Sequence, residues 1–194
     1  MNKLIKRIFI CFSVFCALVM FSNQAMAITL SFNPSDSFIG VGDSIGVDIV
    51  ISGMENYNLA AFDFDINYDD TILQFNSYVL GDKLTDPING QDDWSLGDLG
   101  GGVINLAELS WLFDLSSQPD SFTLATVAFT GISLGTSLLE FSNVILGDEW
   151  GESLSTELES GTIAAIPEPA TILLLVTGMA GFGVFSRKKF RKRR

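Results

Sequence analysis

Large apolar and polar side chains alternate strictly over residues 62–68, where three aromatic residues and one isoleucine are separated by Asp63, Asp65 and Asn67. A segment with a period of two can bury one of its sides only as a β-strand. The same alternation runs through residues 44–51, where isoleucine and valine occupy every second position. These two segments therefore predict half-buried strands, with four large side chains of residues 62–68 in a core.

Further short apolar segments predict more strands and no helix. Residues 122–129 and 138–145 are typical strands, bounded by glycine and asparagine. Residues 106–113 fit either a strand or a short helical turn, and residues 81–102 are rich in Gly and Asp and predict a long loop with at most one short strand. No convincing amphipathic helix is present. Many short strands separated by turns indicate an all-β protein, a jelly-roll or immunoglobulin-like β-sandwich.

The first 27 residues have the organisation of a secretory signal peptide. Basic residues at positions 3, 6 and 7 precede an apolar run of 14 residues, 8–21, and Ala25 and Ala27 supply the small side chains that a signal peptidase requires. The mature chain is predicted to begin at Ile28. Both cysteines, Cys11 and Cys16, lie in the removed segment, so we expect the exported domain to contain no disulfide.

The C-terminal end predicts a single membrane-spanning helix. Residues 170–186 are 17 uncharged, mostly apolar positions, and a helix of that length spans roughly 26 Å, near the lower limit for a bilayer core. Seven basic residues follow within residues 187–194. Such a cluster stays cytoplasmic, so the preceding domain is predicted to lie outside the membrane. Pro167 and Pro169 mark the start of this helix.

The charges of the chain are separated along the sequence. Residues 28–166 contain 22 acidic residues and a single basic one, Lys83, which gives a net charge of −21. Nucleic acid is therefore excluded as a direct partner, because phosphate binding requires clustered cations. The 139 residues are enough for one domain with a core of its own.

The composition of this domain argues against an enzyme. It has no histidine and no cysteine, which removes the commonest general base and nucleophile pairs. A pair of carboxylates suffices for glycoside hydrolysis. However, the spacing of the candidates singles out no pair, so we expect no catalytic residues and rank a carbohydrate-active enzyme as improbable. The candidates are Asp63, Asp65, Asp69, Glu108 and Asp114.

Two kinds of ligand stay open for the acidic domain. Calcium prefers carboxylate oxygens, and acidic pairs occur in turns at 69–70, 92–93 and 148–149, but no established calcium-binding pattern is matched and a solvated acidic surface explains the same residues. We therefore predict no cofactor and assign no metal ligand. For a carbohydrate, Trp94 and Trp150 are the candidate stacking residues, and Trp111 is expected in the core.

The C-terminal seventh of the chain resembles the PEP-CTERM sorting signal of Gram-negative bacteria. The resemblance is carried by Pro167, Glu168 and Pro169, the apolar segment and the arginine-rich end, in that order. It implies recognition by an exosortase, a membrane enzyme thought to cut near the PEP motif, and release to the cell surface or extracellular matrix. The family is associated with species that produce exopolysaccharide and form biofilms.

The region before this signal resembles a cohesin module, a nine-stranded jelly-roll sandwich related to carbohydrate-binding modules. The first half carries the resemblance through the motifs at 32–34, 41–43, 47–49, 59–64, 68–69 and 73–75, and the second half through those at 110–111, 124–129, 135–137 and 148–151. In cellulosomes cohesins bind the dockerins of glycoside hydrolases. No dockerin-binding residue can be transferred to this chain position by position.

The sequence thus predicts a signal peptide (1–27), a cohesin-like sandwich (28–163) and a PEP-CTERM signal (164–194). The expected protein is exported, held transiently at the inner membrane by its C-terminal helix and processed by signal peptidase and exosortase. It then acts without catalysis at the cell surface or in the matrix, by adhesion linked to matrix polysaccharide. The alternative is a scaffold that binds a dockerin-like or other surface protein through one sheet face.

Overall fold

A computed structural model describes residues 27–86, 88, 90, 92–167 and 177 of the chain. Within these residues the backbone forms twelve strands. Their bounds are β1 Ile28–Asn33, β2 Asp36–Gly40, β3 Ser44–Ser52, β4 Leu59–Asn67, β5 Leu73–Leu80, β6 Asp92–Asp93, β7 Gly97–Asp98, β8 Val103–Leu109, β9 Ser121–Gly131, β10 Gly135–Asp148, β11 Thr156–Leu158 and β12 Gly161–Ile166.

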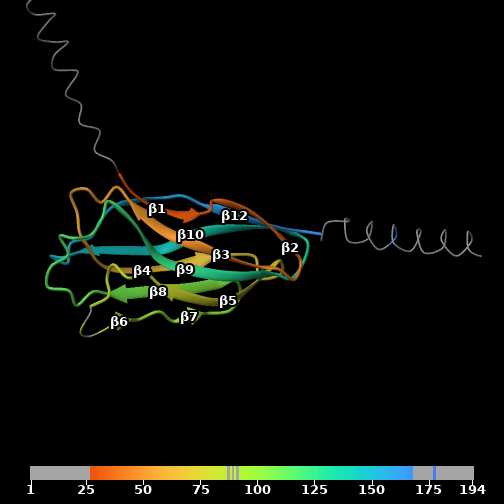
Figure 1. Ribbon diagram of the computed structural model, residues 1–194, viewed down its shortest axis with the longest axis horizontal. Coiled ribbons are helices and arrows are strands. Elements are labelled where there is room, and N and C mark those ends of the chain that lie inside the picture. Colours follow the sequence, from red (N-terminus) through yellow and green to blue (C-terminus); the bar gives the residue numbers. More distant parts are fainter. Residues whose placement is uncertain (1–26, 87, 89, 91, 168–176, 178–194) are drawn as a thin grey trace, which may run out of the picture.

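The described strands form two sheets that pack face to face. One sheet has the order β11-β1-β3-β9-β5, and the other has the order β2-β12-β10-β4-β8-β6, with β7 also paired to β8. Figure 1 shows the strands running along the length of the molecule, with β6 and β7 at one margin and β1 and β12 at the other. The predicted all-β sandwich is confirmed.

The predicted strands correspond closely to the observed ones, and the loop prediction needs a refinement. Residues 44–51 fall in β3, and 62–67 fall in β4, with Tyr68 one residue beyond its end. Residues 122–129 and 138–145 fall in β9 and β10. The ambiguous residues 106–113 divide into the end of β8 and a following loop. The region 81–102, expected to hold at most one short strand, contributes two strands of two residues each, β6 and β7.

The core lies between the two sheets and is formed by the alternating positions. Phe62, Phe64 and Ile66 of β4 are buried as predicted, and Tyr68 packs against the core from a half-buried position. Phe64 stacks on Phe62 at 5.2 Å between ring centroids and meets the edge of the Phe141 ring at 5.6 Å. Aromatic pairs of this kind add about 0.5–1.5 kcal/mol beyond the burial of their area.

The last strand brings the chain directly to the PEP motif. β12 lies between β2 and β10 and continues to Ile166, beyond the boundary at residue 163 that we predicted. The carbonyl of Ile166 accepts a hydrogen bond from the amide of Val41, at 3.1 Å. Pro167 follows at once, so almost no linker separates the sandwich from the motif.

Candidate functional site

The outward-facing side of β4 carries a polar surface whose side chains are joined by hydrogen bonds. Because side chains alternate along a strand, burying Phe62 and Phe64 places Asp63 and Asp65 on the opposite side. The neighbouring strands β8 and β10 pair with β4 on either side. The two carboxylates therefore lie in the middle of a three-stranded surface.

Asn105 of β8 holds both carboxylates in place. Its Nδ2 donates to Oδ1 of Asp63 at 2.8 Å and to Oδ1 of Asp65 at 2.9 Å, while its own Oδ1 accepts from the amide of Leu96 at 3.1 Å. Asn105 is only 8% exposed, so its carboxamide is fixed by its surroundings. The two acidic side chains therefore lose little rotamer freedom when a partner binds.

A β-bulge brings a second amide to the same pair. The register of β10 on β4 shifts between Ser142 and Ile145, and inside that bulge Asn143 has a positive φ of 53°. Asparagine tolerates this left-handed conformation better than other side chains that have a Cβ atom. The bulge directs Nδ2 of Asn143 to Oδ2 of Asp65, at 2.6 Å. Both oxygens of Asp65 are thus engaged, from two different strands.

Apolar side chains border this polar centre. Ile145 pairs with Asp63 across the β10–β4 ladder and is 62% exposed. On the other side Leu109 and Trp94 are also exposed, and the amide of Trp94 donates to the carbonyl of Ala107. We call the surface formed by Asp63, Asp65, Asn105, Asn143 and Ile145 the β4 face. An oriented acidic centre with an apolar margin can bind a partner that offers hydrogen-bond donors or cations within an apolar surround.

The predicted stacking residues lie on different elements. Trp94 follows β6 at one margin of the sheet, and Trp150 follows β10, with β8 and β4 between them. Adjacent strands are about 4.8 Å apart, so the two backbones are on the order of 14 Å apart across the sheet. Both indoles are exposed, yet they do not form one platform.

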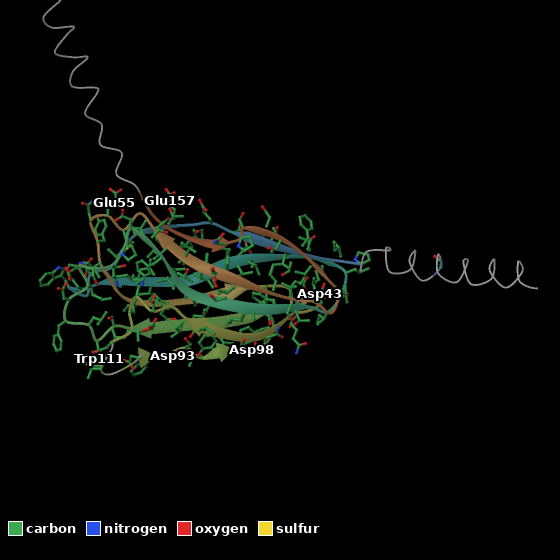
Figure 2. The ribbon with its side chains drawn as sticks, in the orientation of Figure 1. Asp43, Glu55, Asp93, Asp98, Trp111 and Glu157 are labelled. Carbon is green, nitrogen blue, oxygen red and sulfur yellow. The ribbon has the colours of Figure 1, made fainter. Side chains whose placement is uncertain are left out.

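Trp111 differs from its expected place in the core. It is 56% exposed in the loop after β8, and its Nε1 donates to Oδ2 of Asp92 at 2.7 Å. Figure 2 shows Trp111 and Glu55 at the end of the sandwich opposite Asp43. The sequence did not reveal this because the indole is oriented by a residue 19 positions away, which only the tertiary fold brings close.

The remaining carboxylate candidates serve turns or lie buried. Asp69 accepts hydrogen bonds from the hydroxyl and the amide of Thr71, and Asp114 accepts the amide of Ser116. The hydroxyl and then the amide of Thr71 hold the pKa of Asp69 below its usual value, and the side chain and then the amide of Ser116 do the same for Asp114. Glu108 is the opposite case, since burial first, then Asp93 and Asp92, raise its pKa to about 7.

In each acidic turn considered for calcium, one aspartate has an oxygen engaged by a hydrogen bond within the chain. One oxygen of Asp148, Oδ1, accepts the amides of both Trp150 and Glu152. Asp93 is bound by the Tyr78 hydroxyl. Across the part of the chain that the structure describes, no group of three or more His, Cys, Asp or Glu side chains is arranged to hold a metal ion.

Most of the predicted targeting segments lie outside the described residues. Of the signal peptide, with its cleavage site at Ala25 and Ala27, only Ala27 is described, and of the PEP motif only Pro167. Glu168, Pro169 and nearly all of the predicted helix 170–186 are outside, as is the basic end. Among the described residues no helix is long and apolar enough to cross a bilayer.

Comparison with known proteins identifies both parts of the chain. Residues 28–108 match the family profile of the cohesin domain, and residues 165–189 match that of the PEP-CTERM protein-sorting motif. No curated protein matches the chain. The resemblances drawn from the sequence are thereby confirmed.

Solved structures share the fold at low sequence identity. A cohesin–dockerin complex with OlpA from Clostridium thermocellum aligns with a TM-score of 0.61 at 16% identity, covering 73% of this chain and 100% of that one. The sixth cohesin of scaffoldin B from Acetivibrio cellulolyticus, in complex with a Cel5 dockerin, gives 0.58 at 18%, covering 73% and 100%. A non-cellulosomal cohesin from Archaeoglobus fulgidus gives 0.54 at 16%, covering 75% and 94%.

Proposed function

We propose that this chain, in which a cohesin-type sandwich is joined to a PEP-CTERM motif, is an exported, non-catalytic binding protein. Its partner is a protein that carries a cationic or donor-rich patch, and it docks on the β4 face. Both family matches support export and a binding role. The similar structures include complexes of a cohesin with a dockerin.

The observation that carries the proposal is the double fixation of Asp65 by Asn105 and Asn143. Ordering a free side chain at an interface costs about 0.5–1.5 kcal/mol. On the β4 face the side chain of Asp65 is already ordered in the free protein, so binding does not incur this cost for it. The domain also has a net charge of −21, which attracts a cationic partner from a distance and speeds association. A basic protein surface satisfies both features.

The test compares two charge-matched double variants of the full-length chain in mild detergent. Asp63→Lys with Asp65→Lys reverses the centre of the β4 face, while Glu55→Lys with Glu157→Lys makes the same charge change at exposed positions elsewhere. Calorimetric titration against a set of dockerin modules, including any encoded by the same genome, should show at least about a hundredfold weaker binding for the first variant only. Equal binding by both variants would remove the β4 face from the proposal.

A matrix polysaccharide is the second candidate, favoured by the Trp111–Asp92 pair. An exposed indole that is held by a hydrogen bond offers a fixed apolar plane for a sugar ring, and the excess of carboxylates disfavours anionic sugars. Affinity electrophoresis through the host exopolysaccharide would retard the native chain, and Trp111→Ala would abolish the retardation. The matched variant Phe113→Ala changes a fully exposed aromatic residue of the same loop and should have no effect. Retardation that survives Trp111→Ala would count against this site.

We propose that in the cell the protein is anchored transiently in the inner membrane and is then transferred to the cell surface or matrix. Signal peptidase and exosortase are the processing enzymes, and a link to biofilm is the expected setting. Removal of both ends would take away the predicted anchor and ten of the eleven basic residues. The mature domain would then be a strongly anionic particle, which favours solubility in a hydrated matrix.

A further inference from the structure

Glu108 is a carboxylate in an unusual place. It pairs with Phe62 on β4 and with Asp93 on β6, and residues paired across a ladder project from the same face of the sheet. Glu108 therefore points to the inner side, between an aromatic ring and a second carboxylate. Glu108 is 2% exposed, and its Oε1 is buried without a hydrogen-bond partner among the residues that the structure describes. An ionised carboxylate in such a place is costly, because burial removes the charge from bulk solvent.

The groups packed around Glu108 oppose a negative charge on it. β6 contributes Asp92 and Asp93, β5 contributes the Tyr78 hydroxyl and β4 contributes only an apolar ring. Burial works against the ionisation of Asp93, but hydrogen bonds from Ser95 and Tyr78 outweigh it and lower its pKa, so it remains charged.

The one basic residue of residues 28–166 has an acidic partner of its own. Lys83 is the only basic residue between the predicted signal peptide and the C-terminal tail. Its Nζ forms an ion pair with Asp82 at 3.0 Å. Neutral Glu108 is therefore the form that this environment favours.

The element that faces Glu108 lies at the margin of its sheet. β6 and β7 have two residues each, and among the described strands both pair with β8 alone. Between them, Trp94, Ser95 and Leu96 add hydrogen bonds to Ala107 and Asn105 of β8. The hydrogen bond from Tyr78 of β5 to Asp93 of β6, 2.8 Å long, joins the margins of the two sheets directly outside Glu108. Short margins of this kind open at a small fraction of the free energy needed to unfold the whole domain.

We propose that Glu108 is a pH-sensitive latch for residues 92–99, closed when its carboxyl group is protonated and released when the group is ionised. Ionisation places a buried negative charge on Glu108 across the β8–β6 pair from the exposed carboxylate of Asp93, and lifting β6 lets water reach Glu108. Burial, then Asp93 and Asp92, raise the pKa of Glu108 to about 7, so the transition falls near neutral pH. The edge is closed in mildly acidic medium and loosened in alkaline medium. The device concerns this margin alone and holds whether or not a protein docks on the β4 face.

Hydrogen exchange of the full-length chain in mild detergent tests the latch. Exchange is followed by mass spectrometry from pH 5.5 to 8.5 and corrected for its intrinsic pH dependence. Protection of residues 92–99 should fall by at least about tenfold as Glu108 ionises, while protection of β1 stays constant. Glu108→Gln should abolish the fall, because its amide is neutral at every pH. Glu140→Gln, which neutralises an exposed carboxylate on β10, should behave as the native chain.

Two results would overturn the proposal. One is protection of residues 92–99 that does not change with pH in the native chain, and the other is a fall that persists in Glu108→Gln. If Glu108→Gln does not fold, the carboxyl carbon of Glu108 in the native chain can be titrated by NMR. A midpoint near the ordinary glutamate value of 4.5 would then refute the latch, and a midpoint near 7 would support it.

Discussion

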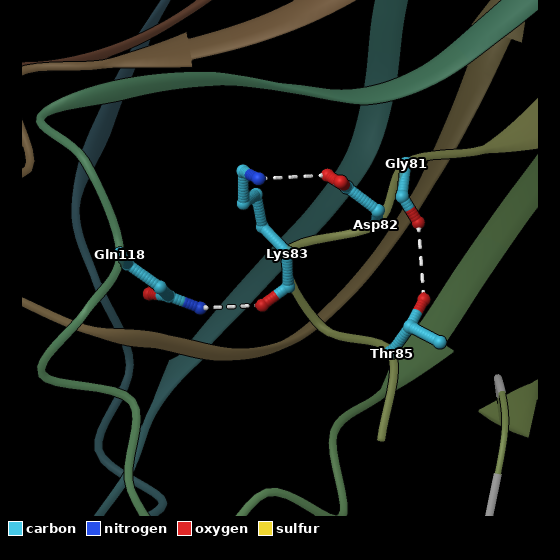
Figure 3. A network of polar contacts seen from close by, with 5 residues as sticks. All are labelled: Gly81, Asp82, Lys83, Thr85 and Gln118. Atoms are coloured by element: carbon cyan, nitrogen blue, oxygen red, sulfur yellow. Dashed lines mark hydrogen bonds and ion pairs between the residues drawn. The ribbon is translucent and has the colours of Figure 1, made fainter. Parts of the chain in front are cut away.

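The carboxamide of Gln118 binds both backbone polar groups of Leu59. Its Oε1 accepts the amide of Leu59 and its Nε2 donates to the carbonyl of the same residue, each at 2.8 Å. The pairing of β8 with β4 ends at Ala61, so this side chain supplies the hydrogen bonds that a further strand residue would have made. Nε2 also reaches the carbonyl of Lys83 at 3.3 Å, as Figure 3 shows. One side chain thus joins three segments.

We expect Gln118→Ala to lower the free energy of unfolding by about 2–3 kcal/mol, because it leaves the buried amide and carbonyl of Leu59 unpaired. Urea denaturation followed by fluorescence measures this loss. Gln118→Glu is a sharper variant, since a carboxylate can accept from the amide but cannot donate to the carbonyl. Gln74→Ala, at an exposed position of β5, should change stability by less than about 0.5 kcal/mol. A Gln118→Ala protein as stable as this control would show that the Leu59 bonds contribute nothing.

The three consecutive glycines before β8 should respond differently to alanine. All three have a positive φ, of 78°, 64° and 78° for Gly100, Gly101 and Gly102. A Cβ atom on Gly102 would lie 2.2 Å from the carbonyl oxygen of Tyr68, which is backbone and cannot turn aside, whereas nothing lies within 4 Å of one on Gly100 or Gly101. We expect Gly100→Ala and Gly101→Ala to cost about 1–2 kcal/mol each for the left-handed backbone. Gly102→Ala should cost clearly more, because the hydrogen bond from the Tyr68 amide to its carbonyl is also displaced.

Thermal melts of the three single variants test this ranking. Equal melting temperatures for all three variants would mean that the whole loop shifts to accept a Cβ atom. The close approach of Gly102 to Tyr68 would then make no separate contribution to stability.

The stability of the domain should be greatest in mildly acidic medium. Glu108 has its pKa raised from 4.5 to about 7, so the folded state holds this proton more tightly than the unfolded state does. Its contribution is complete below pH 4.5 and is lost as the pH rises through 7, by up to about 3 kcal/mol. Asp69, Asp93 and Asp114 have lowered pKa values, so their contribution is present above pH 3.8 and disappears in stronger acid.

Urea midpoints measured from pH 3 to pH 9 would locate the maximum, which we expect between about pH 4 and 5. In Glu108→Gln the fall in stability between pH 4.5 and 7 should be smaller than in the native chain. The fall that remains is the part caused by general repulsion among the acidic residues. An unchanged decline in that variant would assign the effect to the net charge alone.

Substitution of the PEP motif should block sorting and leave the sandwich intact. The last strand ends at Ile166, so Glu168→Ala changes no residue of the described core. We expect the unprocessed chain to accumulate in the inner membrane, as shown by fractionation and by the intact mass of the protein from cells and medium. Glu159→Ala removes an exposed acid shortly before β12 and should be processed normally. Normal processing of Glu168→Ala would separate this chain from the sorting route that its motif indicates.

Part of the β4 face could be read from the sequence and part could not. Alternation in residues 62–68 places Asp63 and Asp65 on the outer surface, because Phe62 and Phe64 must be buried. Nothing in the sequence identifies Asn105 or Asn143 as their partners. These residues lie 40 or more positions away, and their approach depends on the register of β8 and on a bulge in β10. The one local sign of this bulge in the sequence is Asn143, a single asparagine within the alternating residues of β10.

The class of the fold, the separation of charge and the sorting signal follow from the sequence alone, because periodicity, composition and short motifs are local properties of a chain. The inward position of Glu108 depends on tertiary packing, since apolar side chains occur on both sides of β8 and do not show which side faces the core. The exposure of Trp111 beside Asp92 has the same origin. In each case the deciding contact joins strands or loops that are distant in sequence, and such contacts are set by pairing and packing of the whole sandwich.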